Sequence, residues 1–203
     1  MNTTNEETIE AYNQAVDKYI KGSPQFVSDE LKVWIDSNLS QLSKNAKILE
    51  IGSGSGKDAD YFASQGYTME LTDASEGFVE HLKHKGYTAR KFNVLLDDIN
   101  SDYDMVFADA VFLHFTKEEL VAVLNKTFQA VKSGGRLAFT VKVGNGEEST
   151  ARKLDYPRYF NYWQEAEIEV MLKASGFSEI YIKSGNDFRG EQKPDWLYIN
   201  AIR

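Results

Sequence analysis

The chain has 203 residues, of which 42% are hydrophobic and 27% are charged, and its net charge is −8. This length is typical of one globular domain with a full hydrophobic core, and the negative charge argues against nucleic acid as a partner. The absence of cysteine excludes disulfides, thiolate zinc sites and a cysteine nucleophile, and it favours a cytoplasmic location. We expect no membrane association, because no apolar run approaches the ~20 residues that span a bilayer. Residues 1–10 are too polar and acidic for a signal peptide.

Two amphipathic helices are expected before the first strand. Apolar residues between Ile9 and Ile20 recur on one helical face, and those between Leu31 and Leu42 do the same after a break at 22–24. This pattern predicts an N-terminal helical cap over residues 1–45 and a core over residues 46–203, both within a single domain. The helices are expected to cover one face of a sheet.

The rest of the chain alternates between strand and helix patterns. Strands are predicted at 47–51, 67–72, 87–92, 103–108, 136–143, 177–183 and 196–202, with helices at 57–65, 75–84, from 116 to about 133, and 165–175. Such alternation predicts a parallel sheet with helices on both faces. The last two strands lack an intervening helix and should pair antiparallel. The expected fold is therefore an α/β three-layer sandwich, with a Rossmann-like, seven-stranded, mostly parallel sheet, an antiparallel last strand and added N-terminal helices.

A glycine-rich turn follows the first predicted strand, in the sequence Glu-Ile-Gly-Ser-Gly-Ser-Gly at 50–56. Alternating glycines let the backbone turn sharply and approach a ligand closely. The spacing differs from the G-x-G-x-x-G of dinucleotide sites and from a Walker A loop. Asp73 follows the second strand, 21 positions after Gly52. A carboxylate at this spacing can accept the hydrogen bonds of a ribose diol.

The pattern Glu50-x-Gly52-x-Gly54-x-Gly56 with Asp73 resembles motifs I and II of the class I S-adenosylmethionine-dependent methyltransferases. The resemblance covers roughly residues 47–203 and implies S-adenosylmethionine as the cofactor. The family often has an acidic residue where Asn93 stands, although an amide oxygen can also accept from the adenine amino group. Carried over onto this sequence, the implied cofactor contacts are Tyr19, Glu50, Gly52, Ser53, Gly54, Gly56, Asp73, Ala74, Asn93, Val94 and Ala110. Lys57 can pair with the methionine carboxylate, but a solvated surface position is the commoner role.

The loop after the fourth strand carries Asp109 and His114. In the resembled family this loop runs past the sulfonium, which makes Asp109 a candidate electrostatic partner. A neutral imidazole can take a proton from an acceptor hydroxyl or amine, so His114 is a candidate catalytic base. The alternative is a histidine that packs beside Phe112 and Phe115.

An aromatic segment at 154–163 follows the fifth strand, on the expected ligand edge of the sheet. Arg158 suits a carboxylate or phosphate, and aromatic faces suit a planar or cationic substrate. We therefore expect Arg158, Tyr159 and Tyr162 to bind the acceptor. The alternative is a core segment against the N-terminal helices. Residues 144–148 are expected to form a solvated loop.

These features predict a methyltransferase that uses S-adenosylmethionine to methylate a small-molecule acceptor by in-line displacement, with no metal, as a monomer or homodimer. The loop after the fourth strand lacks the Pro-Pro-Tyr/Phe signature of nucleic-acid amino-methyltransferases, and cytosine C5 enzymes need a cysteine. Two alternatives remain open, a non-catalytic S-adenosylmethionine-binding protein and a dinucleotide-dependent oxidoreductase.

Overall fold

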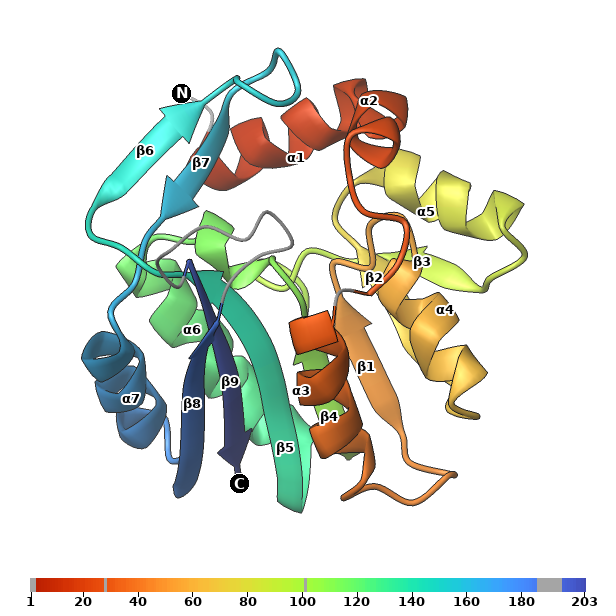
Figure 1. Cartoon of the computed structure of the whole chain (residues 1–203). Helices are drawn as coiled ribbons and strands as arrows, with labels where there is room; N and C mark the ends of the chain where they lie inside the picture. Colours follow the sequence, from red (N-terminus) through yellow and green to blue (C-terminus); the bar gives the residue numbers. More distant parts are fainter. Residues whose placement is uncertain (1–2, 28, 101, 186–194) are drawn as a thin grey trace.

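A seven-stranded sheet forms the centre of the computed structural model, which describes residues 3–27, 29–100, 102–185 and 195–203 (Figure 1). The strand order is β3-β2-β1-β4-β5-β9-β8. The strands are β1 (Ile48–Ile51), β2 (Glu70–Asp73), β3 (Ala89–Lys91), β4 (Tyr103–Ala108), β5 (Val131–Lys142), β8 (Glu179–Gly185) and β9 (Trp196–Ile202). The first five are parallel, and β9 pairs antiparallel with both β5 and β8. The predicted Rossmann-like sheet with an antiparallel last strand is thus confirmed.

Helices cover both faces of this sheet. One face carries α3 (Asp29–Leu39), α4 (Lys57–Ser64) and α5 (Glu76–His84), and the other carries α6 (Lys117–Ala130) and α7 (Glu165–Ala174). Trp34 of α3 packs on Phe107 of β4 on the first face, while Leu124 of α6 and Phe139 of β5 share the cluster on the second. Because both faces are covered, β1 is buried along its whole length and its sequence is a continuous apolar run apart from Glu50. None of the described helices is long and apolar enough to cross a membrane.

Two further pieces of the chain lie over the end of the sheet where the parallel strands finish (Figure 1). They are α1 (Thr4–Gln14) with α2 (Val16–Lys21), and a two-stranded antiparallel hairpin of β6 (Glu147–Thr150) and β7 (Arg158–Asn161). We call these four elements the cap. The backbone N–H of Tyr159 donates to Thr8 Oγ1 over 3.0 Å and joins the two pieces.

The cap differs from the sequence expectation in two ways. The first amphipathic segment forms two helices rather than one, because Ala15 leaves the helical conformation with φ of −131°. The solvated loop expected at 144–148 is wrong for Glu147 and Glu148, which pair with Asn161 and Phe160 of β7. The sequence signal for this hairpin is short and polar, and its order comes from packing against α1 and η1 (Phe112–His114).

Candidate active site

The turn between β1 and α4 brings backbone to the edge of the sheet. Gly52 and Gly54 have φ of +72° and +50°, in the left-handed region that favours glycine. A Cβ on Gly52 would lie 2.4 Å from Cγ2 of Val111, whereas a Cβ on Gly54 would find no atom closer than 4.0 Å. The turn therefore packs tightly on the loop after β4 at Gly52 and leaves room for a ligand at Gly54.

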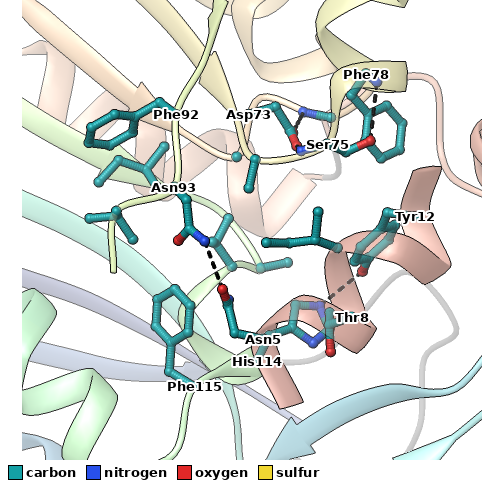
Figure 2. Close-up of a pocket in the computed structure, with 18 of the residues that line it drawn as sticks. Asn5, Thr8, Tyr12, Asp73, Ser75, Phe78, Phe92, Asn93, His114 and Phe115 are labelled. Atoms are coloured by element: carbon teal, nitrogen blue, oxygen red, sulfur yellow. Dashed lines mark hydrogen bonds between the residues drawn. The ribbon is translucent and has the colours of Figure 1, made fainter. Parts of the chain in front are cut away.

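Asp73, at the end of β2, is held by the backbone of two neighbouring turns. Its Oδ2 accepts from Gly54 N over 2.9 Å and its Oδ1 accepts from Ser75 N over 2.8 Å (Figure 2). Burial raises the pKa of Asp73 to about 6, although these backbone N–H groups favour the charged form. Each oxygen keeps a second lone pair, so the carboxylate can accept two further hydrogen bonds from a ligand.

Glu50 and Gly56 lie at the two ends of the glycine turn. Glu50 is buried, and its Oε2 has no hydrogen-bond partner among the described residues. Burial and then the charge of Asp58 raise the pKa of Glu50 above its usual value. Gly56 N donates to Ser53 O over 2.8 Å and Gly56 caps α4. Neither residue is among the described residues that line the cavities defined below.

The loop after β4 is fixed by an ion pair. Lys57 Nζ lies 2.7 Å from Asp58 Oδ1 and 2.8 Å from Asp109 Oδ2, and Thr140 Oγ1 donates to Asp109 Oδ1 over 2.7 Å. The expected surface position of Lys57 is wrong, because its side chain is only 20% exposed. Ala110 has φ of +57°, a conformation that costs a non-glycine residue about 1 kcal/mol. Its N–H donates to Thr140 Oγ1 over 2.8 Å, which helps to hold this strained position.

His114 lies at the end of η1 in a buried chain of hydrogen bonds. Its Nδ1 is 2.6 Å from the carbonyl oxygen of Tyr159, which can only accept, so Nδ1 carries the proton. Its Nε2 must then accept from the Tyr12 hydroxyl, 2.9 Å away (Figure 2). Arg158 Nη1 donates in turn to the Tyr12 oxygen over 3.1 Å. Burial lowers the pKa of His114 to about 3, so the ring is neutral. In this geometry both ring nitrogens are engaged, and a base role for His114 requires Tyr12 to move.

Asn93 follows β3 and connects the sheet edge to the cap. Its amide nitrogen donates to Asn5 Oδ1 over 2.8 Å (Figure 2). Its Oδ1 accepts from Leu95 N over 3.1 Å. The amide oxygen keeps one lone pair for a ligand, and Asn5 of α1 adds a second amide at the same place. Val94 and the aromatic ring of Phe92 lie beside them.

These loops and the cap enclose two adjoining cavities. The first reaches from the glycine turn to Asp73 and Asn93, and the second reaches from the same turn to Lys142 and Arg158. The wall that they share consists of Tyr12, Tyr19, Gly52, Gly54, Asp109, Ala110 and His114. Of the other predicted site residues, Ala74 and Val94 line the first cavity and Ser53 lines the second.

Tyr159 and Tyr162 point elsewhere. Their hydroxyls donate to Glu147 and Glu148 of the hairpin, the second over 2.5 Å. Neither tyrosine is among the described residues that line the two cavities.

Several lining residues escaped the sequence reasoning. The sequence reasoning named Tyr19 and not Tyr12 as a cofactor contact, yet Tyr12 carries the hydrogen bond to His114. Asn5, Thr8 and Ile9 of α1 line the first cavity, and Lys142, Phe160, Trp196 and Tyr198 line the second. The apolar face of α1 and the aromatic segment at 154–163, which contains Phe160, were the usable signals, whereas nothing local marks Lys142 of β5 or Trp196 and Tyr198 of β9.

Comparison with known proteins identifies the family. The family model described as "Methyltransferase domain" matches residues 25–181. The chain therefore belongs to this family, the class I S-adenosylmethionine-dependent methyltransferases, and the cofactor of the class is S-adenosylmethionine.

Sequence and structural relatives agree with this placement. Carboxy-S-adenosyl-L-methionine synthase of Nautilia profundicola is 25% identical over 179 residues, which cover 82% of this chain and 75% of that protein. An S-adenosylmethionine-dependent methyltransferase from Mesorhizobium loti superposes with a TM-score of 0.66 at 13% identity, over 83% of this chain and 96% of that one. Phosphoethanolamine N-methyltransferase 2 of Haemonchus contortus, in complex with phosphomonomethylethanolamine and S-adenosylhomocysteine, gives a TM-score of 0.76 at 13% identity, over 100% of this chain and 60% of that one.

The first cavity fits such a cofactor. The open space at Gly54 admits close approach of a ligand to the backbone, and Asp73 offers lone pairs at the place where a ribose diol would lie. The rings of Phe78 and Phe92 and the side chain of Val94 supply apolar surface beyond it. Aromatic and aliphatic walls with a few convergent polar groups are the usual composition of a cofactor site.

Proposed function

We propose that this protein methylates a small molecule that binds in the second cavity, with S-adenosylmethionine in the first. The observation that carries the proposal is the shared wall at Gly52, Asp109 and Ala110, through which ligands in the two cavities would meet. The second cavity has a volume of about 240 Å³, which suits a small acceptor rather than a folded macromolecule.

In the first cavity, we assign Asp73 to the ribose hydroxyls and Asn93 with Val94 to the adenine. The backbone at Gly52 and Gly54 would lie against the methionine end. Lys57 has its charge taken up by two carboxylates, so we assign it to holding Asp109 rather than to the cofactor. Glu50 and Gly56 are assigned to the shape of the turn.

At the shared wall, the protein would contribute alignment and exclusion of water. The cofactor supplies an activated methyl group on a sulfonium, and in-line displacement needs the acceptor atom, the methyl carbon and the sulfur in a row. The strained Ala110 and the fixed carboxylate of Asp109 hold this wall in one position. Tyr12 and Tyr19 close it from the cap, with their rings 5.4 Å apart. We infer that His114 fixes the Tyr12 hydroxyl, and its role as a base stays a prediction.

Calorimetric titration with S-adenosylhomocysteine, with NAD in a parallel run, tests the cofactor half of this proposal. We expect micromolar binding of S-adenosylhomocysteine and no signal from NAD. Binding of NAD alone would support the oxidoreductase alternative. A methylated product from a panel of small acceptors would exclude the non-catalytic alternative.

A further inference from the structure

We propose that the second cavity binds an anion, so that the acceptor carries a carboxylate or phosphate group held by Arg158. This inference deepens the proposed function and rests on it. It starts from a buried positive charge that the described part of the protein leaves without a negative partner.

Arg158, the first residue of β7, is 6% exposed and lines the second cavity. Its Nη1 donates to the Tyr12 hydroxyl over 3.1 Å, and its Nε has no hydrogen-bond partner among the described residues. No carboxylate within residues 3–27, 29–100, 102–185 and 195–203 forms an ion pair with it. The guanidinium instead lies near the rings of Tyr12 and Phe160, with 5.3 Å and 4.9 Å from its central carbon to the ring centroids.

Aromatic rings alone do not balance such a charge. Cation–π contacts stabilise a desolvated cation only partly, whereas burial of an ion without a partner of opposite charge carries a larger desolvation cost even after relaxation. A negatively charged ligand removes this imbalance. The planar fork of a guanidinium matches the two oxygens of a carboxylate or phosphate.

Lys57, on the same cavity, shows the contrast. Its ammonium lies within 2.8 Å of both Asp58 and Asp109, so its charge is balanced inside the protein. The buried Arg158 and the partly buried Lys57 therefore line one cavity, and of these two cations only Lys57 has carboxylate partners among the described residues. This difference indicates that the negatively charged partner of Arg158 is a ligand rather than a side chain of the protein.

The surroundings of Arg158 strengthen the positive potential. Lys142 and Lys153 line the same cavity, whose described lining contains four basic side chains and two carboxylates. Lys142 Nζ lies 5.7 Å from the ring centroid of Phe160 and 5.8 Å from that of Trp196. This local excess of positive charge contrasts with the net charge of −8 of the whole chain. The aromatic lining favours an acceptor with an apolar body behind its anionic group.

The test is a set of calorimetric titrations of the full chain saturated with S-adenosylhomocysteine. The probes are benzoate, phenyl phosphate and inorganic phosphate, with neutral benzamide as the matched uncharged ligand. We expect benzoate or phenyl phosphate to bind at least tenfold more tightly than benzamide, and the comparison between them identifies carboxylate or phosphate as the preferred group. Equal binding of benzamide and the anions, or no anion binding at millimolar concentration, would overturn the proposal.

Substitutions test whether Arg158 is the residue that binds the anion. Arg158→Gln should weaken anion binding roughly tenfold to a hundredfold, the range for a hydrogen bond between charged groups, while Arg158→Lys should retain part of it. Lys173→Gln removes a positive charge on α7, away from the cavity, and should leave anion binding within twofold of the parent. Unchanged anion affinity in Arg158→Gln would overturn the assignment. If that variant does not fold, Lys142→Gln tests the same potential and should lower anion affinity several-fold.

Titration with S-adenosylhomocysteine separates this inference from the proposed function. The parent and Arg158→Gln should bind S-adenosylhomocysteine alike. If the parent does not bind it, the proposed function fails, and anion titrations without it still test the Arg158 site. If it binds but no anion does, only the anionic acceptor is excluded.

Discussion

The two halves of the candidate active site differ in how their polar groups are balanced. In the half that we assign to the cofactor, Asp73 accepts from two backbone N–H groups, and on the wall shared with the proposed acceptor half Asp109 is paired with Lys57 and held by Thr140. In the acceptor half, Arg158 is buried without a carboxylate partner among the described residues. One half is complete before any ligand arrives, as expected of a preorganised site. In the other half, the charge of Arg158 is balanced only when an anionic ligand binds. This charge therefore indicates the chemistry of that ligand.

The halves also differ in where they come from in the chain. The cofactor half is formed where β1, β2, β3 and β4 end, and parallel strands bring these ends to one edge. The acceptor half is formed by α1, β5, β7 and β9, which are distant in sequence and meet only through the cap. Substitutions in the first half should therefore act on cofactor affinity, and those in the second on the acceptor.

The largest effect is expected at the tightest contact of the cofactor half. Gly52→Ala would place a methyl group 2.4 Å from Val111 Cγ2 at a φ of +72°. We expect a loss of about 2–4 kcal/mol in the free energy of unfolding, from the left-handed conformation together with overpacking. Affinity for S-adenosylhomocysteine should fall at the same time. Urea denaturation and calorimetry measure the two effects.

Gly66→Ala is the matched control for this substitution. Gly66 has a similar φ of +78°, but a Cβ there would meet no atom within 4 Å. It should cost about 1 kcal/mol, the conformational term alone, and leave cofactor affinity unchanged. Val111→Ala in the Gly52→Ala background should recover part of the stability. Equal losses in the two glycine variants would show that the contact with Val111 does not matter.

The second-largest effect is expected at His114, which belongs to the wall shared by the two cavities. Burial lowers its folded-state pKa to about 3, whereas an unfolded chain has a pKa of about 6.5. The neutral ring therefore stabilises the fold fully above pH 6.5, and this contribution is lost as the pH falls toward 3. By pH 4 we expect the parent to lose about 3 kcal/mol more than His114→Asn, the linkage expected for this shift. Chemical denaturation at pH 7.5 and pH 4 gives the comparison.

His81→Asn on α5 is the control, because it removes a histidine that lies outside the described lining of both cavities. The catalytic hypothesis for His114 is tested by the pH–rate profile once an acceptor is known. A fall in rate below neutral pH that is present in the parent and absent in His114→Asn would support His114 as the base. Its pKa would then have to rise when cofactor and acceptor are bound. A profile of unchanged shape with a lower rate would support positioning of Tyr12.

The third effect concerns the ribose assignment of Asp73. Asp73→Asn should weaken S-adenosylhomocysteine binding by about 1.5–3 kcal/mol at pH 8, the range for a hydrogen bond to a charged group. Because the pKa of Asp73 is raised to about 6, the parent should lose affinity as the pH falls through 6, and the gap to the variant should narrow by pH 5. Calorimetry at the two pH values measures it. Unchanged affinity in Asp73→Asn would remove the ribose assignment.

The ionisation of Asp73 should change the free energy of unfolding in the direction opposite to its effect on cofactor affinity. A folded-state pKa above the unfolded value means that Asp73 stabilises the fold below about pH 4, and that this contribution is lost as the pH rises through 6. Relative to the parent, Asp73→Asn should therefore gain unfolding free energy between pH 4 and pH 8. Opposite trends in affinity and stability would separate a binding role for Asp73 from a structural one.

Sequence reasoning predicted the position of those candidate residues whose place follows from strand order. The glycine turn, Asp73, Asn93 and the loop at 109–114 each come directly after a predicted strand, so the sheet topology alone brings them together. The helix predicted to start at 116 likewise begins as expected, because the capping box that Thr116 and Glu119 form there is a local signal.

The acceptor half could not be predicted in this way. Whether Arg158 is buried without a carboxylate partner in the described part of the chain depends on α1 lying against β7, which no local pattern in either segment encodes. Lys57 shows the same limit, since a lysine at a helix start is usually solvated, and here Asp109 from the loop after β4 pairs with it in addition to the neighbouring Asp58 of α4. Distant packing decided which polar side chains face the cavities.

The smallest effect tests the two tyrosines that the sequence assigned to the acceptor. Tyr159 and Tyr162 donate their hydroxyls to Glu147 and Glu148, within the hairpin, and outside the described lining of the second cavity. Removal of either hydroxyl should cost about 0.5–1.5 kcal/mol of unfolding free energy, the net value of one hydrogen bond. Tyr159→Phe and Tyr162→Phe should leave the acceptor KM within twofold, while Arg158→Gln raises it. A large rise in KM for either phenylalanine variant would bring that tyrosine back into the acceptor site, and would show that the hairpin rearranges when the acceptor binds.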